Sequence, residues 1–250
     1  MTNKKILSIV PIGGLGEVGK NMTLYEYGND ILIVDAGIMF PENDMLGIDY
    51  IIPDFEDYLK EKKNRVRGII FTHGHEDHIG AIQHLLEMVN APIYATRLTL
   101  GLVEVKLNRY GLKGKADIRT VKAGDKVQIG PFSVDFFHVC HSIPDGVGLG
   151  IDTPAGLVVH TGDYKFDHTP VDNWPTDYAK LAEFAQRGVS VLLADSTNAT
   201  DPGWTPSERT IDEGLDEVFK SAKGRILVAT FASLISRMQQ VANAAERHGR

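Results

Sequence analysis

The chain has 250 residues, with 26 lysines and arginines against 33 aspartates and glutamates, and therefore a formal net charge of −7. A hydrophobic fraction of 43% is enough to bury a core, which excludes intrinsic disorder as the main state. The single cysteine, Cys140, excludes an internal disulfide and favours a cytoplasmic protein. No apolar run is long enough to cross a bilayer, so no membrane partner is expected. The negative charge argues against wrapping of nucleic acid by the whole surface but leaves a local basic groove open.

Short apolar segments divided by turn residues predict strands over most of the first 195 residues. In chain order these strands are Lys5–Val10, Met22–Tyr27, Ile31–Asp35, Val66–Thr72, Ala116–Val121, Lys126–Ile129, Phe132–His138, Gly148–Asp152, Gly156–Thr161 and Val189–Asp195. A helix is predicted after the fourth strand, because apolar residues such as Ile79, Ile82 and Leu85 recur at helical spacing. Hairpins without regular strand–helix alternation predict an α/β fold with two sheets sandwiched between helices.

The sequence changes character after Asp195. Residues 196–206 are rich in Ser, Thr, Asn, Gly and Pro, which is typical of a boundary between domains. The segments beyond it predict a helix, a strand and a helix over Ser207–Phe219, Arg225–Thr230 and Ala232–Arg247. We therefore expect one domain over residues 1–197 and the beginning of a second α/β domain over residues 198–250.

A glycine-rich segment near the N-terminus resembles two nucleotide-binding motifs. Residues 14–19 read Gly-Leu-Gly-Glu-Val-Gly, which fits G-x-G-x-x-G, and Lys20 nearly completes a P-loop. Both motifs need a helix after the glycines, because helical N–H groups and the helix dipole bind the phosphate. Here the next segment, Met22–Tyr27, is predicted as a strand, and Asn21 stands where a P-loop needs Ser or Thr. The segment is therefore predicted to be a turn near a site, and no nucleotide cofactor is expected.

The strongest chemical signal is the segment Thr72–His78, which reads Thr-His-Gly-His-Glu-Asp-His. His73 and His75 lie two residues apart on extended chain, so their rings point the same way. Asp77 and His78 open the next helix and approach the same region from another side. These four proposed ligands lie within six residues, and imidazole and carboxylate are groups that Zn²⁺ or Mn²⁺ binds. A polar loop with Asp77 as a helix cap would explain one residue but not the three histidines.

This loop resembles the H-x-H-x-D-H motif of the metallo-β-lactamase superfamily, whose fold is an αββα sandwich. The resemblance implies further metal ligands at later strand ends, where His141 and Asp163 match the superfamily pattern. His138 and Cys140 point to the opposite face of their strand and are expected to pack in the core. Asp35 matches the first motif of the superfamily and is expected to orient a metal ligand without binding the metal itself.

The ligands are expected to divide between two divalent ions, zinc or alternatively manganese. The expected sets are His73, His75 and His141 on one ion, and Asp77, His78 and Asp163 on the other. Two ions about 4 Å apart share a hydroxide, lower its pKa and stabilise the attacking and leaving oxygens. Catalysis is therefore assigned to Asp77, His78 and Asp163. The ligand set alone does not choose between an ester, an amide, a thioester and a phosphodiester. His160 is close enough to Asp163 in sequence to support that ligand.

Longer motifs elsewhere resemble the ribonuclease J family, which belongs to the β-CASP branch of the superfamily. They lie at Pro41–Asp49, Thr161–Asp167, Ala194–Asn198, Asp201–Glu208 and Thr230–Ser233, so the resemblance runs through the chain. Asp195 matches the first acidic β-CASP motif and is expected to support the metal site. Ser233 matches a position near the pocket for a 5′-phosphate or a backbone phosphate. A capping role explains Asp195 or Ser233 equally well.

The resemblance implies a ribonuclease that hydrolyses RNA phosphodiester bonds by a metal-bound hydroxide, with 5′-to-3′ exonuclease and endonuclease activity. Its expected roles are RNA processing, including that of rRNA, and RNA decay. Its partner would be single-stranded RNA in a channel under the β-CASP domain, and the full-length protein is expected to be a homo-oligomer. The family continues past residue 250, so residues 198–250 are expected to be a truncated β-CASP domain. The alternatives are a hydrolase of a small thioester or lactam and a non-catalytic RNA-binding scaffold.

Overall fold

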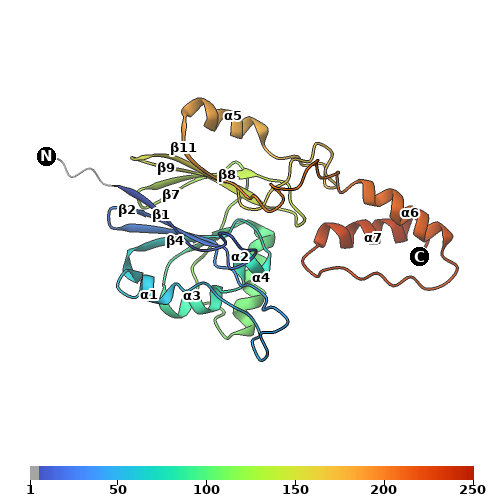
Figure 1. The fold of residues 1–250 in the computed structure, drawn as a ribbon, viewed down its shortest axis with the longest axis horizontal. Coiled ribbons are helices and arrows are strands. Elements are labelled where there is room, and N and C mark those ends of the chain that lie inside the picture. The colour runs from blue at the N-terminus through green and yellow to red at the C-terminus, as the bar shows by residue number, and fades with distance from the viewer. Residues whose placement is uncertain (1–5) are drawn as a thin grey trace.

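The computed structural model describes residues 6–250, and its strands form two sheets that pack face to face (Figure 1). The strands of the first sheet are β1 (Leu7–Gly13), β2 (Met22–Tyr27), β3 (Asp30–Val34), β4 (Val66–Ile70), β5 (Ile93–Ala95) and β6 (Ile118–Thr120). Those of the second sheet are β7 (Lys126–Ile129), β8 (Phe132–His138), β9 (Val147–Thr153), β10 (Gly156–His160) and β11 (Val189–Leu193). Their spatial orders are β1-β2-β3-β4-β5-β6 and β11-β10-β9-β8-β7.

Helices cover the outer faces of both sheets. All helices of the described chain, in order, are α1 (Glu56–Leu59), a 3-10 turn (Lys63–Arg65), α2 (Glu76–Ile79), α3 (Ile82–Met88), α4 (Arg97–Arg109), α5 (Tyr178–Arg187), α6 (Thr210–Ser221) and α7 (Ile235–Arg247). The helices α1, α3 and α4 lie on the first sheet and α5 lies on the second, so the expected αββα sandwich is confirmed (Figure 1). None of the described helices is long and apolar enough to span a membrane.

The alternation of side chains along the strands builds the core in layers. Phe136 of β8 is fully buried between the two sheets, where it belongs to the same cluster as Tyr25 of β2. Its neighbour Phe137 points to the other face and packs on Phe184 of α5, with ring centroids 5.7 Å apart. Successive residues of a strand face opposite sides of the sheet, so a run of apolar residues serves two layers.

The first 195 residues follow the predicted strands closely, with β2, β7 and β8 matching to the residue. The sequence did not identify β5, α4 or α5. The strand that the sequence predicts at Arg225–Thr230 is wrong, because these residues form no strand and Leu227 is 88% exposed. A strand is stable only with a hydrogen-bonding neighbour, and the described chain places none beside this segment.

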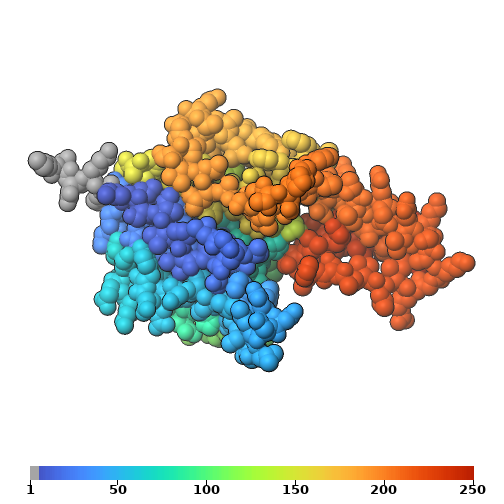
Figure 2. All heavy atoms as spheres, in the orientation of Figure 1, coloured from blue at the N-terminus to red at the C-terminus, as the bar shows by residue number. Residues whose placement is uncertain are grey.

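The last two helices form a separate lobe beside the sandwich. In Figure 2 the atoms of α6 and α7, coloured towards red, protrude from one end of the molecule. The two helices pack on each other, and Phe219 and Ala244 are their buried apolar residues. Each begins three residues later than the sequence predicts, at Thr210 and Ile235.

Candidate metal centre

Six polar side chains converge where three loops meet at the end of the sandwich. The loops follow β4, β8 and β10, and the first of them runs into α2, which carries Asp77 and His78. The six side chains are His73, His75, Asp77, His78, His141 and Asp163. The nitrogen and oxygen atoms form two groups, each within 4.8 Å, that could hold a metal ion. One group is His73, His75, His141 and Asp163, and the other is Asp77, His78 and Asp163. The structure therefore brings together all six residues that the sequence proposed as ligands.

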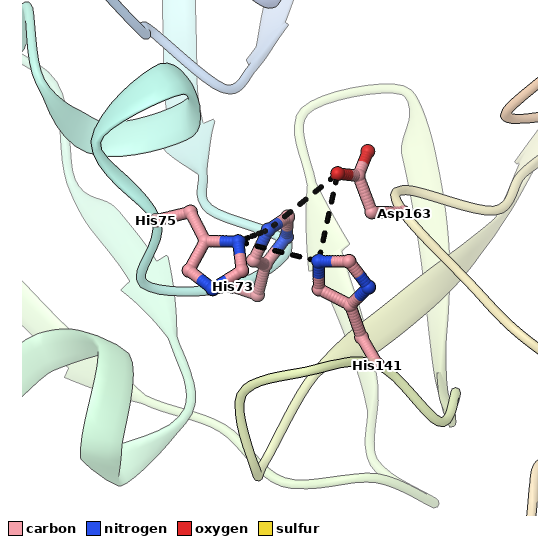
Figure 3. A group of neighbouring side chains, drawn as sticks. All are labelled: His73, His75, His141 and Asp163. Atoms are coloured by element: carbon pink, nitrogen blue, oxygen red, sulfur yellow. Dashed lines mark hydrogen bonds and ion pairs between the residues drawn. The ribbon is translucent and has the colours of Figure 1, made fainter. Parts of the chain in front are cut away.

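In the first group three imidazoles face one another (Figure 3). The Nδ1 atom of His75 lies 3.1 Å from Nε2 of His73 and 3.2 Å from Nε2 of His141. Burial, together with the charges of neighbouring histidines, lowers the pKa of His73 well below its usual value. Burial likewise lowers the pKa of His75, to about 4, and that of His141. Neutral imidazoles carry free lone pairs, so their chemistry fits a divalent cation.

The Asp163 carboxylate lies between the two groups. Its Oδ2 atom is 3.6 Å from Nε2 of His141 and 4.0 Å from Nε2 of His73, whereas its Oδ1 atom is 3.3 Å from Nε2 of His78. Burial raises the pKa of Asp163, but the hydrogen bond and charge of His78 and the charges of His141 and His75 lower it to about 2. One ionised carboxylate thus faces both sets of ligand atoms, which suits a bridging ligand.

Asp35 lies behind His78 and outside the two ligand groups. Its Oδ2 atom accepts hydrogen bonds from Nδ1 of His78 at 2.8 Å and from Oγ1 of Thr72 at 2.9 Å. Its Oδ1 atom accepts one from the Thr72 backbone N–H at 2.8 Å. Burial lowers the pKa of His78, but the Asp35 and Asp163 carboxylates raise it well above its usual value. The bond to Nδ1 turns Nε2 of His78 toward Asp77 and Asp163, and such a bond sets the orientation of a metal-ligating imidazole.

The backbone beside Asp35 supports the turn that carries Asp77 and His78. Asp35 itself has a φ of 63°, a left-handed conformation that Asp tolerates better than most residues. The N–H of Ala36 then donates to the His78 carbonyl at 2.7 Å, and a Cβ at Gly37 would overlap the Asp77 carbonyl oxygen. Only glycine fits this close approach. The need for glycine at position 37 is not visible in the local sequence, because it comes from a chain segment forty residues away.

Two residues excluded as ligands are in the core, as predicted. His138 is buried, its ring stacks on Trp174 at a centroid distance of 3.9 Å, and its Nδ1 lies 2.9 Å from the Pro175 carbonyl oxygen. The thiol of Cys140 is also buried and faces the Trp174 carbonyl at 3.3 Å. Neither residue belongs to the two ligand groups.

The glycine-rich turn and Asp195 line a cavity of about 410 Å³ that reaches Asp77, His78 and Asp163. Residues 14–19 form a turn between β1 and β2, with no helix after them, as predicted. The Oδ1 atom of Asp195 accepts bonds from the backbone N–H and the hydroxyl of Thr197, at 2.8 and 2.6 Å. Asp195 therefore borders the site while its carboxylate stabilises a turn.

Ser233 lies on the other side of the centre, in a groove of about 580 Å³. The groove also contains His75 and Asp77, and it runs along α4, which contributes Lys106 and Arg109. Neither basic residue is marked by the sequence pattern, which does not predict α4. The lining of the groove also includes exposed aromatic side chains, with Phe40 68% and Phe231 82% exposed.

Known proteins resemble the chain over almost its whole length. The family model "Metallo-beta-lactamase superfamily" matches residues 15–200. Ribonuclease J of Thermus thermophilus is 46% identical over 251 residues, an alignment that covers 98% of this chain and 44% of that protein. Ribonuclease J2 of Bacillus subtilis is 44% identical over 248 residues and is likewise covered over 44% of its length. The chain therefore spans less than half the length of these relatives.

The resemblance to the ribonuclease J family that the sequence motifs indicate is confirmed by these alignments. A solved structure agrees on the fold alone. It is a protein of unknown function from Enterococcus faecalis, with a TM-score of 0.72, 18% identity, and coverage of 96% of this chain and 63% of that one. The family match over most of the sandwich, together with the two facing sheets, identifies the chain as a member of the metallo-β-lactamase superfamily.

Proposed function

We propose that this chain carries the hydrolytic centre of a metal-dependent ribonuclease that cleaves phosphodiester bonds of single-stranded RNA. One observation carries the proposal: the complete cluster of six ligand-type side chains lies in a chain that is 46% identical to a ribonuclease J. Both 5′-to-3′ exonuclease and endonuclease activity, in RNA processing and decay, are part of the proposal. So is the cytoplasmic location, for which the single, reduced Cys140 is the support.

Two divalent ions, zinc or alternatively manganese, would be held by the two ligand groups. When bound there, such ions supply a water of lowered pKa and stabilise negative charge on the reacting phosphate. The chain's own contribution is to position the ligands. Asp163 faces both groups, Asp77 and His78 complete the second, and Asp35 holds His78 in one orientation. We assign catalysis to Asp77, His78 and Asp163, and a supporting position to Asp195.

The groove beside His75 is the proposed path of the RNA. Lys106 and Arg109 supply positive charge for the phosphates, although Nζ of Lys106 also bonds the Glu76 carboxylate at 2.7 Å. Exposed Phe40 and Phe231 offer rings on which bases stack, an interaction worth about 1–3 kcal/mol per base. The Ser233 hydroxyl would donate a hydrogen bond to a phosphate oxygen in the same groove.

We further propose that residues 1–197 form the metallo-β-lactamase-like domain and residues 198–250 the beginning of a β-CASP domain. The composition change after Asp195 and the separate lobe of α6 and α7 support this division. We also propose that the full-length protein assembles into homo-oligomers, and the resemblance to the ribonuclease J family is the support for this.

The test is cleavage of a single-stranded RNA labelled at its 5′ end, with zinc or manganese added to metal-free protein. Cleavage should require metal and should be lost in His75→Ala, whereas His168→Ala, an exposed histidine outside both groups, should match the unaltered chain. Turnover of a thioester or lactam without RNA cleavage would contradict the proposal. RNA that is bound but never cleaved when metal is restored would instead indicate a non-catalytic scaffold.

A further inference from the structure

A buried tyrosine and a histidine join the two sheets below the candidate centre. Tyr25 lies on β2 of the first sheet and is fully buried, and His160 is the last residue of β10 in the second sheet. The hydroxyl of Tyr25 is 2.8 Å from Nδ1 of His160, and the two rings meet edge to face with centroids 6.2 Å apart. His160 stands three residues before Asp163, so the pair anchors the strand end from which that carboxylate projects.

The surroundings determine where the protons of the pair lie. Burial, aided by the charge of Asp35, raises the pKa of Tyr25 far above its usual value, so the phenol keeps its proton. Burial lowers the pKa of His160, although the charge of Asp35 opposes this, so the imidazole is neutral. Among the described residues the Tyr25 hydroxyl has His160 as its hydrogen-bond partner. If Nδ1 carried the ring proton, the phenolic proton would be buried without an acceptor, which costs about 1–3 kcal/mol.

The favoured arrangement therefore has Tyr25 donating to Nδ1 and the ring proton on Nε2. His160 lines the cavity of about 410 Å³ together with Thr161, Asp163 and residues 14–19. Within the described chain the Nε2 atom of His160 has no hydrogen-bond partner. It is not a buried atom of that kind, so it is accessible from the cavity. The N–H thus opens on the cavity.

The carboxylates near this donor have other partners. Asp35 is occupied by Thr72 and His78, and Asp163 faces His78 and His141. A fixed N–H donor beside a hydrolytic centre suits an oxygen on which negative charge develops during the reaction. Of the groups that the proposed substrate carries, the non-bridging phosphate oxygens are of this kind.

We propose that Nε2–H of His160 donates a hydrogen bond to a non-bridging phosphate oxygen of the RNA being cleaved, and that Tyr25 positions the imidazole for this role. The inference rests on the proposed ribonuclease function for its substrate. Beside the two ligand groups, the RNA phosphate would thus have a direct contact with the protein. That contact lies in the cavity that His160 and the glycine-rich turn line.

The test compares three variants of the metal-loaded chain in RNA cleavage. His160→Ala removes the donor and should lower kcat about 100-fold or more with bound metal little changed. It also leaves the buried Tyr25 hydroxyl without an acceptor, so the melting temperature should fall and kcat is compared well below it. His160→Gln places an amide N–H near the position of Nε2 and should recover part of the loss. Tyr25→Phe removes only the phenol and should give a smaller loss than His160→Ala.

A second readout does not depend on activity. Nitrogen NMR of the ¹⁵N-labelled, metal-free chain should show His160 as a neutral ring protonated at Nε2, with Nδ1 accepting a hydrogen bond. A ring protonated at Nδ1 would overturn the inference, as would full kcat in His160→Ala or a loss explained by lost metal. If the unaltered chain cleaves no RNA, the proposed function fails together with the assigned substrate. If the unaltered chain cleaves RNA as fast as His160→Ala, the inference fails alone.

Discussion

The sandwich and the helical pair of α6 and α7 differ in how their side chains are held. In the sandwich, His73 is 1% exposed and Asp35 is 2% exposed, and both lie in a network of hydrogen bonds under the ligand atoms. In the segment that connects α6 to α7, by contrast, Leu227 is 88% exposed and Phe231 is 82% exposed. The candidate centre is thus organised by the core of the sandwich, and the helical pair adds a wall to the groove beside it.

A polar joint connects the two regions. The Oδ2 atom of Asp167 accepts bonds from Oγ of Ser207 at 2.9 Å and from the Glu208 backbone N–H at 3.3 Å, just before α6. The Glu208 carboxylate then pairs with Nη2 of Arg237 on α7 at 2.6 Å and lies 3.6 Å from Nζ of Lys165. Asp167 and Lys165 belong to the loop that follows Asp163. The helical pair is therefore attached through a loop of the centre itself.

The largest expected effect is on catalysis, from the carboxylate that faces both ligand groups. Asp163→Asn keeps the side-chain shape but removes the charge, so RNA cleavage should fall by more than about 100-fold. Mutation of a residue that only hydrogen-bonds a metal ligand already lowers activity about 10–100-fold, and Asp163 is itself a proposed ligand. Asp201→Asn, an exposed position in the boundary segment, is the matched control and should cleave normally. Cleavage assays with metal in excess would measure both, and undiminished turnover in Asp163→Asn would refute its bridging role.

The second prediction compares the stability of the two regions. Phe136→Ala empties a fully buried position between the sheets and should lower the free energy of unfolding by about 3–5 kcal/mol. Leu227→Ala shortens an apolar side chain that is exposed, so the change should stay within about 0.5 kcal/mol. Denaturant titrations of both variants provide the measurement. A large loss in Leu227→Ala would show that the segment before α7 packs in solution.

The third prediction concerns metal affinity. Asp35→Asn keeps a residue that tolerates the left-handed backbone but weakens the acceptor for Nδ1 of His78. Metal should bind about 10–100-fold more weakly, while the fold is kept. Calorimetric titration with zinc measures this, and Asp54→Asn, an exposed carboxylate on the surface, serves as the control. Equal affinity in the two variants would remove Asp35 from the supporting role.

The smallest expected effect is a pH dependence of the metal-free chain. Burial and the charge of His141 are the main causes that lower the pKa of His75 to about 4 in the folded state, from 6.5 for an ordinary histidine. Between pH 6.5 and 4, His75 is therefore protonated in the unfolded chain but neutral in the folded chain. Protonation thus stabilises the unfolded state, and the free energy of unfolding falls as pH falls. His75→Ala should show a shallower fall over this window in denaturant titrations. An unchanged slope would place the pKa of His75 near its ordinary value.

The local chemistry of the centre follows from short segments of sequence. The segment Thr72–His78 holds four proposed ligands within six residues, so they lie near one another without any contact to a distant segment. The strands β7 and β8 are predicted to the residue, because turn residues mark where they begin and end. Gly124-Asp125 precedes β7, and Gly130-Pro131 separates β7 from β8. His141 and Asp163 were found only through the family resemblance, because nothing in their own neighbourhood marks them as ligands.

The tertiary structure decided the features that depend on distant segments. Gly37 is required by the carbonyl of Asp77, and the proton of His160 is placed by a tyrosine 135 residues away. Arg225–Thr230 has the composition of a strand, but no strand among residues 6–250 pairs with it, so composition alone predicted it wrongly. Periodicity and turn residues report local conformation. Burial, pairing and the meeting of the three ligand loops arise only when the two sheets pack, because each needs atoms from segments far apart in the chain.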